Sequence, residues 1–118
     1  EGYDPGIMDF VKIGNGSMGG KARGIAFIGS LLQLAIQQDS VFAEVMVSVP
    51  QTCVVTTQGF DDFIAHNSFQ FTEGMSDQKI CDLFLSGDMP GWLQADLRSY
   101  LEKIEYPLSI RSSSMLEE

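Results

Sequence analysis

The chain has 118 residues and a hydrophobic fraction of 44%, which is enough for one small folded domain with a modest core. It carries 16 acidic and 7 basic side chains, for a net charge of −9. This balance disfavours binding to a nucleic-acid duplex, which requires a basic surface to displace counterions. It equally disfavours adhesion to an anionic membrane. Residues 1–37 hold three acids and three bases, so the acidic excess lies after them.

The cysteines and the histidine indicate the cellular compartment and whether a metal site is expected. The chain ends indicate whether the sequence is part of a larger protein. Cys53 and Cys81 match no metal or redox spacing, so we expect two reduced thiols in a cytoplasmic protein. His66 is the only histidine and has no cysteine nearby, so we expect no metal site. No segment is apolar enough to span a membrane, and the N-terminal residues lack a signal-peptide pattern. Because the chain has no starting Met and no terminating signal, we expect part of a larger protein.

The N-terminal half predicts a strand, a helix and a second strand. Residues 10–13 favour a short strand that leads into several glycines. Residues 20–38 have apolar side chains at helical spacing, which predicts a mostly buried helix. After an irregular stretch, residues 53–56 are rich in β-branched side chains and predict a buried strand. The predicted core face of the helix consists of Ile25, Ile28, Leu32 and Ala35, widened by Phe27, Leu31 and Ile36.

Three further helices are expected after the second strand. Thr56 or Thr57 is a candidate cap for a helix that places Phe60, Phe63 and Ile64 on one face. Ser76 is a candidate cap for the next helix, which Gly87 closes. Pro90 suits the first turn of the last helix. The core stripe of this last helix comprises Leu93, Leu97, Tyr100, Leu101 and Ile104, and Pro107 ends it.

The final segment completes the predicted fold. Residues 108–111 alternate between apolar and polar side chains, which predicts a third strand with Ser109 and Arg111 on its polar face. The predicted fold class is therefore α/β (α+β), with a small mixed sheet and about four helices. Three strands are few for a finished domain. We therefore expect residues 1–118 to form a single partial domain with no internal boundary.

The glycine-rich segment KIGNGSMGGKARG nearly matches two phosphate-binding motifs. Its glycines at positions 14, 16 and 19 have the dinucleotide-binding spacing. The acid expected about 20 positions later is Asp39, which follows a predicted helix instead of a strand. A Walker loop would require Gly in place of Asn15, and Ser or Thr in place of Ala22. Neither motif is therefore satisfied.

A physical argument for an anion site remains at this segment. Successive glycines let backbone N–H groups face an anion, and a helix start adds the positive end of its dipole. Lys21 and Arg23 lie in the first turn of the predicted helix, where their charge opposes the dipole unless an anion is bound. The alternative is an ordinary glycine-rich turn with both side chains solvated.

A second candidate is Arg111, followed by three serines. A guanidinium fork and neighbouring hydroxyl groups can bind phosphate, although a serine-rich segment alone is more often a flexible loop.

Three segments in this order carry a resemblance. GSMGGKARG, VPQTCVVTTQGFDDF and PLSIRSSS resemble the N-terminal nucleotide-binding domain of the phosphoenolpyruvate synthase and pyruvate, phosphate dikinase family. That domain has a Gly-Gly-Lys turn, a strand that ends in Thr-Thr, and a strand that ends in Arg-Ser-Ser. The resemblance spans about residues 10–114.

The resemblance implies the first part of an ATP-grasp-like domain that binds ATP with Mg²⁺. Lys21 and Arg111 would contact the ATP phosphates, with Gly19, Gly20, Arg23 and Ser112 beside them. In the family, ATP phosphorylates a histidine on another domain, which passes the phosphoryl group to pyruvate on a further domain. The resemblance places those two domains and the metal ligands beyond Glu118. It gives His66 no role and leaves the acceptor open.

Two alternatives stay open at this point. One is a non-catalytic nucleotide-binding or regulatory module with the same fold. The other is a nicotinamide-binding domain, which rests only on the spacing of three glycines. For the 118-residue chain alone we expect no turnover and at most weak nucleotide binding, because half of a cleft buries little of a ligand.

Overall fold

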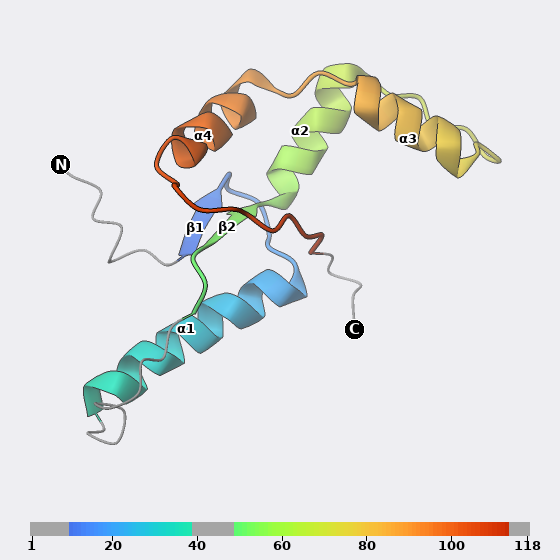
Figure 1. Ribbon diagram of the computed structural model, residues 1–118. Helices are drawn as coiled ribbons and strands as arrows, with labels where there is room; N and C mark the ends of the chain where they lie inside the picture. Colours follow the sequence, from blue (N-terminus) through green and yellow to red (C-terminus); the bar gives the residue numbers. More distant parts are fainter. Residues whose placement is uncertain (1–9, 39–48, 114–118) are drawn as a thin grey trace.

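The computed structural model describes residues 10–38 and 49–113, and in this part the chain forms two strands and four helices (Figure 1). The mixed α/β class with a small sheet and four helices is confirmed. Asp39 and the irregular stretch predicted after it lie outside the described residues, apart from Val49. The elements are β1 (Phe10–Ile13), α1 (Gly20–Gln38), β2 (Thr52–Val55), α2 (Thr57–Asn67), α3 (Asp77–Ser86) and α4 (Gly91–Leu101).

The two strands form the centre of the fold. They pair in parallel, with Phe10 opposite Thr52 and Ile13 opposite Val55. A parallel pair needs a crossover connection, and here that connection includes α1. The core at this pair is small, since Ile13 and Val54 are buried, together with Leu93 of α4. The carboxyl ends of both strands lead directly into the segments that form the candidate site.

The predicted strand at residues 108–111 is wrong for the described part of the chain, because this segment belongs to no sheet. It runs past the two strands without regular structure (Figure 1), and Ile110 is 97% exposed. Alternating side chains define two faces, but a strand also needs a neighbouring backbone to bond to. Residues 108–111 have the alternating side chains, but among the described residues no neighbouring strand pairs with them.

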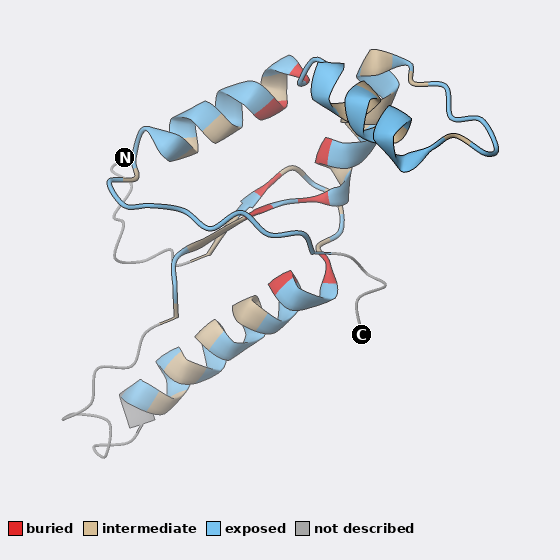
Figure 2. Cartoon of the chain, turned by 45° about the vertical axis from the view of Figure 1, so that its right-hand side comes forward, coloured by how far each residue is buried: buried red, intermediate tan, exposed pale blue. Residues whose placement is uncertain are grey.

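The prediction that α1 is mostly buried is also wrong. Figure 2 shows burial only at its first turn, where Ala22 is 4% exposed, whereas Phe27 is 64% exposed and Leu34 is 54% exposed. The helix has 19 residues and is about 28 Å long, so a two-stranded sheet covers little of it. The radius of gyration is 18.0 Å, against about 13 Å for a compact chain of this length. The molecule is therefore open.

Helices α2 and α3 meet through phenylalanine rings. Phe63 of α2 lies 5.6 Å from Phe84 of α3, and Phe69 lies 5.5 Å from Phe63, measured between ring centroids. The predicted cap of α3 is confirmed, because Ser76 Oγ accepts the N–H of Lys79 at 3.4 Å and Gly87 ends the helix. These contacts hold α3 against α2, on the far side of α2 from α1 (Figure 1).

The last helix differs slightly from its prediction. Pro90 occupies the cap position, one residue before the first turn, and α4 ends at Leu101. Ile104 therefore lies after the helix, in a turn where its N–H donates to the carbonyl oxygen of Leu101. The predicted core stripe is only partly buried, since Leu93 is 5% exposed and Leu101 is 53% exposed.

Candidate functional site

The glycine-rich loop, residues 14–19, is tied to the start of α2 by its own backbone. Three consecutive N–H groups of the loop donate to side-chain oxygens of three consecutive residues, which follow β2 at the start of α2. Asn15 N–H donates to Gln58 Oε1 at 2.7 Å, Gly16 N–H to Thr56 Oγ1 at 3.2 Å, and Ser17 N–H to Thr57 Oγ1 at 3.0 Å. We call these three acceptor residues, 56–58, the latch.

Two backbone bonds run in the opposite direction. Thr57 N–H donates to the carbonyl oxygen of Ser17 at 2.9 Å, and Thr56 N–H donates to that of Ile13 at 3.0 Å. Thr56 occupies the predicted cap position of α2, but its hydroxyl makes no capping bond and accepts from Gly16 instead. Its side chain is 2% exposed, so this oxygen is buried as well as bonded. The latch therefore fixes the first half of the loop.

The first two glycines are required by this packing. Gly14 has a φ of 87°, and a Cβ at this position would lie 2.5 Å from Thr56 Oγ1. A Cβ at Gly16 would lie 2.6 Å from both the backbone nitrogen of Gln58 and Thr57 Oγ1. Contacts inside the protein thus account for both glycines, and the neighbouring N–H groups are already bonded. This arrangement gives no support to the dinucleotide alternative.

The second half of the loop meets the C-terminal segment. A Cβ on Gly19 would overlap the carbonyl oxygen of Ser113, and Ala22 N–H donates to Ser113 Oγ at 3.4 Å. Gly20 differs, because apart from its chain neighbours and the backbone of its own helix no described atom lies within 4 Å of a Cβ placed there. The start of α1 is therefore open at Gly20 and lined on one side by Ser113.

The structure thus brings the two sequence-predicted segments together, although 91 residues separate the bonded pair. Lys21, Arg23, Arg111 and Ser112 are all exposed around this contact. The first turn of α1 contains no acidic residue, in contrast to the usual preference of the helix dipole. The sum is an exposed, basic helix start beside a basic and hydroxyl-bearing segment, which is suited to an anion.

Sequence reasoning missed the role of the latch and of Ser113. The Thr-Thr pair is predicted as the end of a strand and a candidate helix cap, but not as a partner of the loop, because a hydroxyl directly after a strand is the usual capping signal. A threonine pair in front of a helix, together with glycines that follow a parallel strand, is the signal that points to the latch. Nothing local in the sequence singles out Ser113 from its serine neighbours.

The other candidate groups lie apart from this contact. His66 is exposed near the end of α2, and the described residues contain no group of three His, Cys, Asp or Glu suited to a metal ion. Neither Cys53 nor Cys81 is in a disulfide, and burial raises the pKa of the Cys53 thiol. In the part of the chain that the structure describes, no helix has the length and hydrophobicity needed to cross a membrane.

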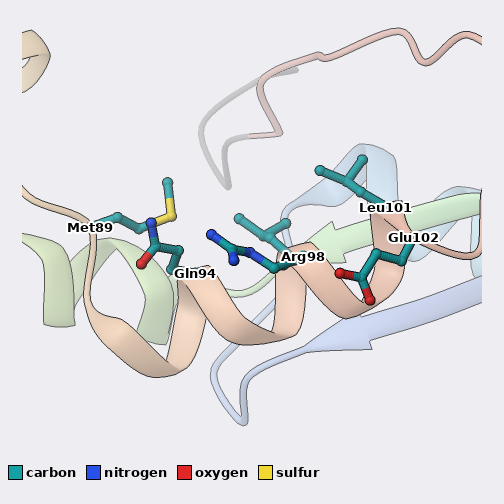
Figure 3. A pocket seen from close by; sticks show the side chains of 6 residues that line it. Met89, Gln94, Arg98, Leu101 and Glu102 are labelled. Carbon is teal, nitrogen blue, oxygen red and sulfur yellow. The ribbon is translucent and has the colours of Figure 1, made fainter.

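A separate hollow of about 500 Å³ lies along α4 (Figure 3). Its walls are the side chains of Met89, Gln94, Leu97, Arg98, Leu101 and Glu102. None of the residues predicted to bind phosphate lines this hollow. It is therefore not part of the candidate site.

Comparisons with known proteins identified no relative. No protein-family model, curated protein or solved structure matches the chain. The features that bear on function are therefore the loop, the helix start and the segment beside it.

Proposed function

We propose that the chain is the ATP-binding front end of a phosphotransferase similar to phosphoenolpyruvate synthase. The observation that carries the proposal is the contact between Gly19 and Ser113, which places the Gly-Gly-Lys turn beside the Arg-Ser-Ser segment. These are two of the three segments on which the resemblance depends. The third contains the latch, which holds the same loop.

The two halves of the loop suggest how the phosphates would bind. The N–H groups of residues 15–17 are bonded to the latch, so phosphate oxygens are assigned to the start of α1 at Gly20. There the helix dipole and the glycine backbone favour an anion. Lys21 and Arg111 would neutralise phosphate charge and orient the nucleotide, with Arg23 and Ser112 at the rim.

The remaining parts of the reaction are assigned outside the described residues. ATP would supply the phosphoryl group to a carrier histidine on another domain, and pyruvate would receive it to become phosphoenolpyruvate. The Mg²⁺ ligands are assigned beyond Glu118. The contribution of this chain is therefore binding and charge neutralisation.

The first test is a titration of the ¹⁵N-labelled 118-residue chain with MgATP, followed by NMR. We expect weak binding, with shifts of the amide signals at residues 19–23 and 111–113. Lys21→Ala should weaken binding about tenfold, because it removes a charge-assisted contact. Lys79→Ala is the matched control, since Lys79 is also an exposed lysine in a first helical turn. Equal effects of the two substitutions would contradict the assignment.

The second test concerns phosphoryl transfer in a polypeptide that also carries the histidine domain. Lys21→Ala and Arg111→Ala should each slow single-turnover phosphorylation of that histidine by about 100-fold, as expected for loss of a group that stabilises developing charge. Arg98→Ala removes an exposed arginine from α4 and should have no effect. Unchanged phosphorylation in both test variants would overturn the proposal.

The alternative is a non-catalytic nucleotide-binding or regulatory module. It is motivated by the acidic balance of the chain and by the described residues, which contain no group of three His, Cys, Asp or Glu that could hold a metal ion. In this case ATP would bind as in the first test, but no histidine would be phosphorylated in the second. Tight binding of NADH without binding of ATP would instead favour a nicotinamide-binding domain.

A further inference from the structure

One side chain, Gln58, connects the glycine-rich loop to α4. Its Oε1 accepts the N–H of Asn15 at 2.7 Å, the shortest of the three latch bonds. Its Nε2 donates to Asp62 Oδ2 at 3.5 Å, and the same oxygen accepts Trp92 Nε1–H at 3.0 Å. A chain of hydrogen bonds therefore runs from the loop backbone, along the first turns of α2, to the indole of α4.

Trp92 also lies against the loop itself. A Cβ placed on Gly14 would be 3.3 Å from Cη2 of the indole, which shows how closely the ring approaches the backbone there. The indole thus contacts Gly14 directly and reaches Asn15 through Asp62 and Gln58. Since Trp92 is the only tryptophan of the chain, its fluorescence reports on this junction.

The members of the latch differ in what they can do. Thr56 is buried at 2% exposure, so its hydroxyl serves the packing of the core. Thr57 is exposed, and both its hydroxyl oxygen and its backbone N–H bond to the backbone of Ser17. Gln58 alone bonds both to the loop and to the group that holds Trp92.

We propose that Gln58 is a positioning residue, which holds the Asn15 amide and thereby directs the start of α1 toward the phosphates of the nucleotide. The part that concerns phosphate rests on the proposed function, whereas the part that concerns the loop does not. We assign no phosphate contact to Gln58, because its side-chain amide bonds to Asn15 and Asp62. Gln58 acts by holding the loop. Helix α4 supports Gln58 because Trp92 bonds to Asp62, which in turn bonds to Gln58.

The simpler interpretation is a glutamine–aspartate pair one helical turn apart, which stabilises α2 only slightly. The chain contains a matched pair of this kind in α3. There Gln78 Nε2 donates to Asp82 Oδ1 at 2.9 Å, on an exposed helix face. Gln78→Ala therefore removes the helical pair without touching the loop, and it is the control for Gln58→Ala.

The first measurement is amide hydrogen exchange in the 118-residue chain, without nucleotide. Gln58→Ala should speed exchange at Asn15 about three- to tenfold, the loss expected for one hydrogen bond, and should alter Trp92 emission. Gln58→Glu keeps an acceptor for Asn15 N–H, but it replaces the bond to Asp62 with repulsion between two carboxylates one helical turn apart. It should therefore speed exchange at Asn15 less than Gln58→Ala does while altering the emission, and it also serves if Gln58→Ala folds poorly. Unchanged exchange in Gln58→Ala, or an equal effect of Gln78→Ala, would overturn the proposal.

The second measurement is the MgATP titration of the same variants. Gln58→Ala should weaken binding about tenfold, whereas Gln78→Ala should stay close to the unmodified chain. If the unmodified chain binds ATP and Gln58→Ala binds it equally well, the positioning role is overturned. If no variant binds ATP while the exchange result holds, the part of the proposal that concerns phosphate fails and the control of the loop by Gln58 is supported.

Discussion

The two halves of the glycine-rich loop use the same residue type for different purposes. In residues 14–17 the glycines allow the latch to approach, and the N–H groups between them are bonded to side chains of the protein. In residues 19–21 the chain begins α1, where Gly19 lies against Ser113 and Gly20 faces open space. Only the second half leaves room for a ligand at a helix start.

A sequence can therefore match the spacing of a phosphate-binding motif without forming the binding site. The dinucleotide spacing of positions 14, 16 and 19 is satisfied, yet each of these glycines has a protein neighbour that requires it. Gly20, which the dinucleotide pattern ignores, has space beside it, as does Gly24 about one turn further along α1. The environment of a glycine, more than its place in a pattern, therefore indicates where an anion fits.

The largest expected effect separates the two halves directly. Gly16→Ala should lower the free energy of unfolding by about 2–3 kcal/mol, because the new Cβ would lie 2.6 Å from the backbone of α2. Gly20→Ala should raise it by about 0.5 kcal/mol, since alanine favours the helix and meets no neighbour. Urea unfolding measures both. Similar losses in the two variants would show that the loop is not divided in this way.

The next effect concerns the buried member of the latch. Thr56→Val keeps the shape of the side chain but removes the acceptor for Gly16 N–H, and it should cost about 1–3 kcal/mol in the free energy of unfolding. Thr57→Val should cost less than about 1 kcal/mol, because Thr57 is exposed and water can replace its oxygen. The same urea experiment ranks them. A larger cost for Thr57→Val would mean that burial does not decide the strength of the latch.

A smaller effect is expected where the second half meets its neighbour. Ser113→Ala should cost about 0.5 kcal/mol or less, because the bond from Ala22 N–H to Ser113 Oγ is long, at 3.4 Å, and only partly buried. Exchange at the Ala22 amide, measured by NMR, should rise without a change at Gly16. If exchange rises equally at both amides, the contact with Ser113 is not confined to the second half of the loop.

The smallest expected effect is a pH dependence of the free energy of unfolding. It arises from Cys53 in β2, the strand that precedes the latch. Burial raises the pKa of the Cys53 thiol, so iodoacetamide should alkylate Cys53 several-fold more slowly than the exposed Cys81 at neutral pH. The Cys53 thiol therefore stays protonated to a higher pH in the folded state than in the unfolded state. The free energy of unfolding should therefore fall slightly as pH rises above the usual pKa of a thiol. Equal alkylation rates, followed by mass spectrometry, would indicate that β2 opens readily.

Most of the secondary structure could be predicted from the sequence because its signals are local. The bounds of α1 match the helical periodicity, and Ser76 and Gly87 mark both ends of α3 as expected. Burial of α1 and the strand at residues 108–111 could not be predicted correctly. Each depends on a second surface or backbone, and a periodic pattern shows only that a face exists, not what covers it.

The candidate site was predictable in part for the same reason. The sequence singles out Lys21 and Arg111, and their segments lie together in the structure through Ser113. The hydrogen bonds of the latch could not be predicted from local sequence patterns. Its three bonds join positions 40 to 43 residues apart, so they exist only once β1 and β2 have paired.

This long separation has a consequence for the order in which the molecule folds. Closing a segment of some 40 residues costs roughly 3 kcal/mol of chain entropy before the parallel strands or the latch return any stability. The shape of the loop is thus acquired late, by docking of two distant stretches. A peptide of residues 10–38 would contain all the glycines of the motif and none of the acceptors that shape it. Until the strands pair, the nascent chain therefore lacks the bonds that fix the first half of the loop.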